Sequence, residues 1–354
     1  MPTVSIDTFF ACSLMILLVL SAMTATSTFL NPQINNNVSN GLSEKYKEIS
    51  KLFLLNYGEP SSWGQDGQTT PETFGLARED SDIPYELDVD KVSRLNSENV
   101  YALRYDEIFT VADVPDVSFR IEVKPVFDVT INLTATYNEV NATVYQLEVL
   151  TQKSGLSVRT ELNCYLLAEN YLEMVYDGYS SGNVRFNVSL SDSINGPALL
   201  VALAKSDSNA KVASFNAYAF AHNSAEPEPR GTFLRLSPLN HTLDAAFSSS
   251  NTSLSTAYAL TFNYNSTLTE IEMGSESTVF SIPSLLDGPM IIVVSGWNST
   301  VFFNEWTAYP QVPLQVGADF TSSTPTSGVF AYTNTVTINC AIYECTIWLG
   351  GPRR

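Results

Sequence analysis

The sequence is poor in basic residues and in histidine. Its 354 residues include 18 Lys and Arg against 37 Asp and Glu, and the first basic residue is Lys45. The formal net charge is -19, and a phosphate backbone repels such a chain, so nucleic-acid binding is excluded from the expected functions. Only His222 and His241 could serve a Ser-His-Asp triad or a histidine metal site. We interpret both as solvated loop residues.

The chain also lacks the short motifs that hold metals or phosphates. It has no cysteine pairs at zinc-finger spacing, no His-Glu-x-x-His, no EF-hand loop and no glycine-rich phosphate loop. Catalytic carboxylate pairs stay open as an alternative, because 37 acidic residues offer many pairs and no pattern marks one of them. We therefore predict a protein without catalytic, cofactor-binding or metal-binding residues.

Cysteine is scarce too, with four residues. Cys12 lies in an apolar run and is interpreted as a small buried hydrophobe. Cys164 has no near neighbour in the sequence, whereas Cys340 and Cys345 flank a predicted turn. The three cysteines outside the run allow three single-disulfide pairings and leave one thiol over. We predict the pairing Cys340–Cys345.

An apolar run fills the N-terminal region, from Thr8 to Met23, with Asp7 at its start. A helix of about 18 to 20 residues crosses the ~30 Å hydrocarbon core of a bilayer. A cleaved secretory signal is one interpretation, although its basic n-region is missing and residues 22–25 match a cleavage site only loosely. An uncleaved signal anchor is a second, but it leaves the costly carboxylate of Asp7 unexplained.

A third interpretation rests on the residues around this carboxylate. Val4-Ser5-Ile6-Asp7 resembles the archaeal class III prepilin pattern, in which an acidic residue stands five residues into the mature chain. The resemblance implies that Asp7 pairs with the amino terminus of a neighbouring subunit, and that a helix face around Phe9, Phe10 and Ile16 binds other subunits' helices. The basic-glycine leader of that pattern is missing, since only Met1-Pro2 precedes Thr3, so processing stays open.

The next segments are interpreted as a linker with an amphipathic helix, residues 31–58, and an ordered loop region that we call the cap, residues 59–114. Residues 31–58 begin with an Asn-rich, Pro-broken stretch, interpreted as a linker or helix break, and continue as an amphipathic helix over 43–55. Residues 59–114 contain a Gly- and Pro-punctuated loop with Trp63 and Phe74. Asp88 is a predicted N-cap of a short helix, and a second helix is predicted over 98–109.

The cap carries a further resemblance. Gly58-x-Pro60-x-x-Trp63-Gly64, Pro71-x-x-Phe74-Gly75-Leu76-Ala77 and Tyr85-x-Leu87-Asp88-x-x-Lys91-Val92 are similar to an archaeal family of pilin-like surface proteins. The similarity is best over residues 1 to about 110 and continues faintly to Tyr309-Pro310-Gln311-Val312-Pro313. It implies an exported, helix-anchored protein.

Beyond residue 115 the pattern is that of β-strands. Segments such as 128–137 and 183–190 alternate with period two and are separated by turn residues. Gly196-Pro197 followed by an apolar run recurs at Gly288-Pro289, a period of about 90 residues, near the size of one Ig-like sandwich. Chance similarity of two buried strands is the alternative. We predict two Ig-like β-sandwich units, 115–225 and 226–354, after an N-terminal transmembrane, pilin-like helix over 1–30.

Acceptor triplets for N-linked glycans are frequent beyond the apolar run and favour export of this part of the chain. The predicted sites are Asn37, Asn132, Asn141, Asn187, Asn240, Asn251, Asn265 and Asn298.

The sequence thus predicts a mainly β structural protein of the cell surface, a filament subunit or minor pilin or adhesin that is anchored and assembled through its N-terminal helix. Its expected partners are copies of itself, the membrane and N-linked glycans. One alternative is an anchored binding module for glycans or an S-layer, which an exposed Trp297 or Trp306 would favour. Another is a secreted β-scaffold hydrolase, which a cleft with close carboxylates would favour.

Overall fold

The structure is a computed structural model that describes residues 6–114, 117–285, 287–320 and 328–350. Within the N-terminal helix it describes the side chains of residues 14–24 and 41–55. The chain separates into two compact units, Met1–Ser50 and Lys51–Arg354.

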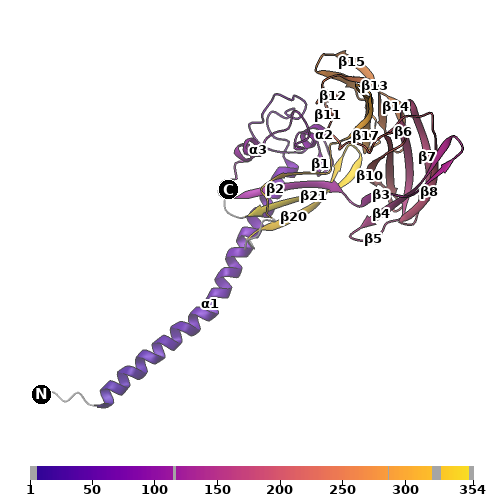
Figure 1. The fold of residues 1–354 in the computed structure, drawn as a ribbon. Coiled ribbons are helices and arrows are strands. Elements are labelled where there is room, and N and C mark those ends of the chain that lie inside the picture. The colour runs from indigo at the N-terminus through magenta and orange to yellow at the C-terminus, as the bar shows by residue number, and fades with distance from the viewer. Residues whose placement is uncertain (1–5, 115–116, 286, 321–327, 351–354) are drawn as a thin grey trace. The chain divides into compact units, whose positions relative to one another are not determined.

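Helix α1 (Ile6–Leu55) is 50 residues long and continuous (Figure 1). The predicted linker or break after residue 31 is therefore wrong. An Asn inside a helix costs less than ~0.7 kcal/mol relative to Ala, and a Pro costs about 3 kcal/mol. A break, in contrast, would require the helix after it to form a new and unfavourable nucleus. In the described part of the chain, no helix has both the length and the apolar character needed to cross a membrane.

The second unit contains a five-stranded sheet built from distant parts of the chain, which we call the terminal sheet. Its order is β1-β20-β21-β2-β19, and Figure 1 shows the yellow strand β21 between β20 and β2. The strands are β1 (Glu86–Leu87), β2 (Ser118–Pro125), β19 (Leu314–Gly317), β20 (Phe330–Ile338) and β21 (Ala341–Gly350). The predicted boundaries assign β2 to the first sandwich unit and the last strands to the second. The structure differs because β2 and β21 pair along eight residues of each strand, a ladder that a sequence pattern does not specify.

The end of α1 is fixed by aromatic packing against the cap. Phe53 is fully buried, and its ring lies edge-on to Phe74 at 5.1 Å and to Phe119 of β2 at 5.2 Å. The prediction that Asp88 is the N-cap residue of α2 (Val89–Ser93) is confirmed, because its carboxylate accepts hydrogen bonds from two backbone N–H groups in the first turn of the helix. Helix α3 (Tyr105–Val111) begins seven residues later than predicted.

Two strand groups follow, each with one shared core; we call them sandwich 1 and sandwich 2. In sandwich 1, β3-β4-β8 face β7-β6-β9-β10, and β5 adds to β4. The strands are β3 (Asp128–Glu139), β4 (Ala142–Lys153), β5 (Leu156–Ser157), β6 (Thr160–Ala168), β7 (Tyr171–Ser180), β8 (Asn183–Ser191), β9 (Ala198–Ser206) and β10 (Asn209–Phe220). Alternate residues such as Leu147 and Leu200 enter the core from opposite sheets.

Sandwich 2 repeats this arrangement. Its sheets are β11-β12-β16-β15 and β14-β13-β17-β18, with a core that includes Leu243 and Ile292. The strands are β11 (Leu234–Leu239), β12 (Thr242–Phe247), β13 (Thr252–Leu260), β14 (Asn265–Thr267), β15 (Thr269–Met273), β16 (Ser277–Ser281), β17 (Met290–Asn298) and β18 (Val301–Tyr309). The prediction of a mainly β fold with several sheets is confirmed.

The repeated Gly-Pro segments occupy equivalent places in the two sandwiches. Each Gly-Pro leads into an inner strand, β9 or β17, and the sheet orders β10-β9-β6-β7 and β18-β17-β13-β14 match. Both glycines are required by close backbone contact. A Cβ atom on Gly196 would lie 2.4 Å from the His222 carbonyl oxygen, and one on Gly288 would lie 2.5 Å from that of Asn339. The recurring Gly-Pro segments therefore belong to a structural repeat.

Candidate functional site

The predicted assembly residues lie on α1. Asp7, Phe9 and Phe10 are helical, and their side chains fall outside the described part of the structure. Ile16 is described and is 61% exposed. It lies within an unbroken exposed apolar segment, Leu14–Leu20, in which every side chain is at least 49% exposed. A helix that is apolar on all sides is normally buried in a protein interior or a membrane.

Most predicted glycosylation sites are accessible. The side chain of Asn37 is outside the described part; six of the other seven asparagines are exposed, namely Asn132, Asn141, Asn187, Asn240, Asn251 and Asn265. Asn132 pairs with Glu148 across β3 and β4, and Asn187 pairs with Gln146 across β8 and β4. Residues two apart on a strand share a face, so Asn132 and Asn187 lie on the same outer face of sandwich 1.

Asn298 differs from the other sites. Its side-chain nitrogen donates to Ser249 Oγ at 2.6 Å, to the Ser250 carbonyl at 3.2 Å and to Thr252 Oγ1 at 3.3 Å. This nitrogen is the atom to which a glycan would be attached. The same amide group thus already ties the end of β17 to the loop that precedes β13.

The predicted disulfide Cys340–Cys345 is wrong, since both cysteines are free in the structure. Cys340 lies in the two-residue turn between β20 and β21, with a φ of 67°, and is exposed. Cys345 is buried in β21 opposite Asn334. Five residues along a strand span about 16 Å, far beyond the ~4.4–6.8 Å between the Cα atoms of a disulfide.

The interpretation of His222 as a solvated loop residue is also wrong. His222 is 1% exposed, with Nδ1 2.9 Å from the Tyr145 hydroxyl and Nε2 3.1 Å from the Ser191 carbonyl. Its ring therefore links the segment after β10 to Tyr145 of β4 and to the last residue of β8. His241 is exposed, as predicted. Among the residues that the structure describes, no cluster of three His, Cys, Asp or Glu could hold a metal ion.

Within the ranges that the structure describes, three polar contacts join the two sandwiches. Lys205 Nζ of β9 lies 2.7 Å from Asp287 Oδ1, and both side chains are largely buried. Burial alone would raise the pKa of Asp287, but hydrogen bonds from Lys205 and the Asn263 backbone outweigh it and lower the pKa. Asn163 donates to the Phe262 carbonyl at 2.7 Å, and Asn304 donates to the Pro197 carbonyl at 2.8 Å.

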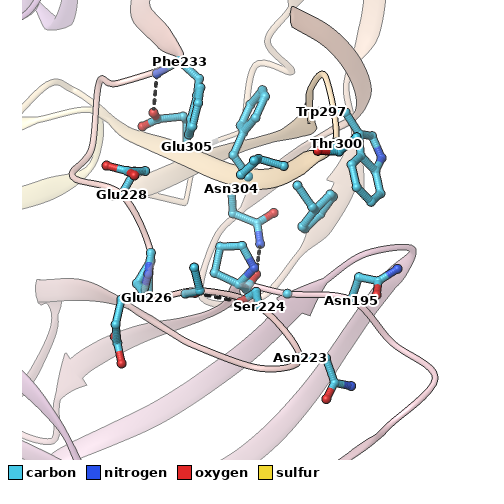
Figure 2. A pocket seen from close by; sticks show the side chains of 18 residues that line it. Asn195, Asn223, Ser224, Glu226, Glu228, Phe233, Trp297, Thr300, Asn304 and Glu305 are labelled. Atoms are coloured by element: carbon cyan, nitrogen blue, oxygen red, sulfur yellow. Dashed lines mark hydrogen bonds between the residues drawn. The ribbon is translucent and has the colours of Figure 1, made fainter.

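A cleft opens beside the third of these contacts (Figure 2). Its volume is about 480 Å³, within the ~300–1,000 Å³ typical of small-molecule sites. One wall is formed by residues 195–197, 219 and 223–228 of sandwich 1 and the following linker, and the other by Phe233 and the β17–β18 hairpin of sandwich 2. Trp297 and Thr300 stand on the hairpin side, across from Asn195 and Ser224.

The walls of the cleft are held by internal hydrogen bonds. Asn304 accepts from Ser295 Oγ at 2.6 Å while it donates to Pro197. Glu305 accepts from the backbone N–H groups of Gly231 at 2.7 Å and Phe233 at 3.1 Å. Burial raises the pKa of Glu305. Both carboxylate oxygens face the 231–233 loop, so Glu305 holds this wall of the cleft in place.

The rim of the cleft, in contrast, carries polar side chains that make no hydrogen bond or ion pair to other described residues. Glu226, Glu228 and Thr300 are exposed, and their side chains have no hydrogen bond or ion pair in this part of the structure. The eighteen lining residues contain no Lys, Arg or His. The rim therefore offers hydrogen-bond acceptors and one hydroxyl, next to an aromatic ring.

Trp297 is well placed to supply that ring. It lies directly opposite Phe302 in the β17–β18 ladder, and the two rings meet edge to face with centroids 5.3 Å apart. The other predicted candidate, Trp306, is less available, because the Arg230 guanidinium lies 4.5 Å above its ring and pairs with Glu98. A groove of about 700 Å³ runs past Trp306, and both residues of this ion pair line it.

Sequence reasoning named Trp297 and missed the cleft itself. The cleft depends on the end of β9, the polar linker and the β17–β18 hairpin, which are about 100 residues apart at the extremes. The repeated Gly-Pro was the available signal, since Pro197 precedes the first residue of β9 and contacts Asn304.

Comparison with known proteins adds little. No protein-family model and no curated protein matches the chain. Among solved structures, the chain is similar to HBP35 of Porphyromonas gingivalis, with 13% sequence identity and a TM-score of 0.20, over 52% of this chain. The chain spans 64% of that structure. A TM-score this low carries no argument about fold or function.

Proposed function

We propose that this chain is a pilin-like structural protein of the cell surface. Helix α1 first holds it in the membrane and then binds the helices of other copies during assembly. Two Ig-like units and the terminal sheet form its external part. The observation that carries the proposal is the exposed apolar segment Leu14–Leu20, on a continuous helix of 50 residues.

Exposure of such a segment to water is costly. Burial of apolar surface is worth about 25 cal/mol per Å², and a contiguous exposed apolar patch marks a contact with a membrane or another protein. Seven consecutive apolar side chains surround the helix on all sides, so contact along one edge would leave the rest in water. A bilayer, or a bundle of identical helices, covers every side.

Asp7 fits assembly better than permanent insertion. A carboxylate near the bilayer interior is costly unless it is paired. In the proposed filament its partner is the amino terminus of an adjacent copy. The six exposed acceptor asparagines are consistent with a location of the β-rich part outside the cell.

The direct test introduces a charge into the apolar segment. Full-length protein carrying Ile16→Asp is compared with Leu156→Asp, because Leu156 is an equally apolar residue that is 75% exposed on β5. We expect Ile16→Asp to abolish retention on cells and the filaments sheared from them, as seen by electron microscopy and immunoblotting. Leu156→Asp should leave both unchanged. Filaments that persist in the Ile16→Asp strain would overturn the proposal.

An anchored module that does not polymerise gives a different result. The wild-type protein would then fractionate with membranes, and no filament that contains the protein would be seen in the wild-type or the Leu156→Asp strain. This outcome would retain the anchor and remove the pilin-like role.

A further inference from the structure

We infer that the cleft between the sandwiches binds a neutral or N-acetylated carbohydrate, with Trp297 as the stacking ring. This binding goes beyond the proposed structural function and does not require polymerisation. It would give the external part of the chain a ligand of its own.

The cleft has a suitable size and fixed walls. Its volume of about 480 Å³ accommodates a small ligand. Asn304 is bonded on both sides, to Pro197 and to Ser295, and Glu305 holds the 231–233 loop. The walls are thus set before a ligand arrives, which reduces the entropy lost on binding.

Trp297 gives the cleft an aromatic surface. It is partly exposed, in contrast to Phe302 and Phe303, which are at most 4% exposed. Its edge-to-face contact with Phe302 fixes the plane of the indole. The negative face of an aromatic ring attracts weakly positive C–H groups, and one face of a pyranose ring presents a row of them. The indole N–H adds a hydrogen-bond donor.

The charge of the rim selects against anionic ligands. Glu226 and Glu228 provide up to four carboxylate acceptors, and Thr300 provides a hydroxyl, none of them committed within the described residues. Sugar hydroxyl groups are donors that can satisfy such acceptors. The lining residues include no cationic side chain, so a phosphate, sulfate or carboxylate ligand would meet only repulsion.

The mouth of the cleft is accessible. Thr300 belongs to the acceptor triplet of Asn298, and a glycan there would stand at this mouth. The two hydrogens of the Asn298 side-chain nitrogen are instead shared among three acceptors in residues 249–252. The cleft is therefore left open to a carbohydrate from another molecule.

The test begins with full-length protein on a printed array of neutral, N-acetylated, acidic and amino oligosaccharides, followed by calorimetry with the best binder. Spermidine serves as a cationic probe. We expect saturable binding of a neutral or N-acetylated oligosaccharide and none of spermidine. Trp297→Ala should weaken it by about 10-fold or more, a loss of about 1.4 kcal/mol. Tyr179→Ala is the matched control, because Tyr179 is 71% exposed on β7, away from the cleft.

A second variant guards against misfolding of Trp297→Ala. The double variant Glu226→Gln and Glu228→Gln changes only exposed side chains and should weaken binding several-fold with an unchanged melting temperature. The inference is overturned if no neutral or N-acetylated oligosaccharide binds, if only spermidine binds, or if all variants bind like the wild type. Filament yield is scored on the same strains, so loss of sugar binding and loss of assembly are distinguished.

Discussion

Tyr309 donates its hydroxyl hydrogen bond to Asp90 Oδ1 at 2.8 Å, and so joins two residues that are 219 positions apart. The Asn240 backbone N–H donates to the same oxygen at 2.8 Å. Asp90 belongs to α2, Tyr309 ends β18, and Asn240 lies in the β11–β12 turn. This one carboxylate therefore fixes the cap to sandwich 2.

The neighbouring residues extend the same junction. Gln311 donates its backbone N–H to Ser93 Oγ, and its side-chain oxygen accepts from Asn99 at 2.9 Å. Residues 90–99 and residues 309–311 thus meet in the structure, and each segment supplies buried hydrogen-bond partners to the other.

Removing the Tyr309 hydroxyl should destabilise this junction. Tyr309→Phe leaves a buried carboxylate short of a donor, and the loss should be about 1–3 kcal/mol in unfolding free energy, measured by denaturant titration at pH 7. Tyr179→Phe, an exposed tyrosine, is the control and should cost nothing measurable. Equal stability of the two variants would contradict the role assigned to the hydroxyl.

The same site predicts a pH dependence. Burial raises the pKa of Asp90, while hydrogen bonds from Asn240 and Tyr309 offset part of the rise. The native state then binds a proton more tightly than the unfolded chain, so this group's contribution to stability falls as the pH rises from ~4 through the raised pKa. Asp90→Asn should flatten the decline in unfolding free energy between pH 4 and 7 relative to the wild type. A steeper decline in the variant would show that the sign is wrong.

The loop over residues 58–75 should depend on Arg94. The Arg94 guanidinium is buried over the Trp63 ring and donates to the carbonyls of Trp63, Asp66 and Thr69. Arg94→Met would leave these acceptors unpaired and should cost at least about 3 kcal/mol, with rapid proteolysis in the loop.

Arg78→Met is the matched control for this loop. Arg78 is 61% exposed and pairs with Glu86, so its loss should cost under ~1 kcal/mol. Similar stability and similar proteolysis of the two variants would contradict the stabilising role of Arg94.

Glycan occupancy should follow the exposure of each acceptor asparagine. We expect Asn132, Asn141 and Asn265 to carry glycans in native protein, because they are exposed. Asn298 should be unmodified, since the two hydrogens of its side-chain nitrogen are shared among three nearby acceptors, whereas the nearby and exposed Asn251 is the internal comparison. Site-specific mass spectrometry of native protein decides this. Modified Asn298, or bare Asn132, Asn141 and Asn265, would count against it.

The sequence predicted those features that depend on neighbouring residues. The alternation over 128–137 corresponds to β3, and Asp88 caps α2 through N–H groups two and three residues away. Features that depend on distant residues were missed. Strand β1 is two residues long and exists only because Glu86 pairs with Thr337, so no local pattern marks it.

Errors at single residues have the same origin. His222 reads as a loop residue until Tyr145, 77 positions away, is seen to contact its ring. The cleft was missed because its walls come from two sandwiches, although Trp297 itself was named. The continuous course of α1 was missed because turn-forming residues were weighted above the cooperativity of a long helix.

Assembly of copies of this chain by α1 through Asp7 is the central claim, and a charge-removing substitution tests it most directly. Asp7→Asn keeps the shape of the side chain and removes its charge; Asp106→Asn, an exposed aspartate on α3, is the control. Filaments sheared from cells are counted by electron microscopy, and export is checked by immunoblotting. We predict normal export of both variants and no filaments from Asp7→Asn. Wild-type numbers of filaments from Asp7→Asn would contradict the assembly role.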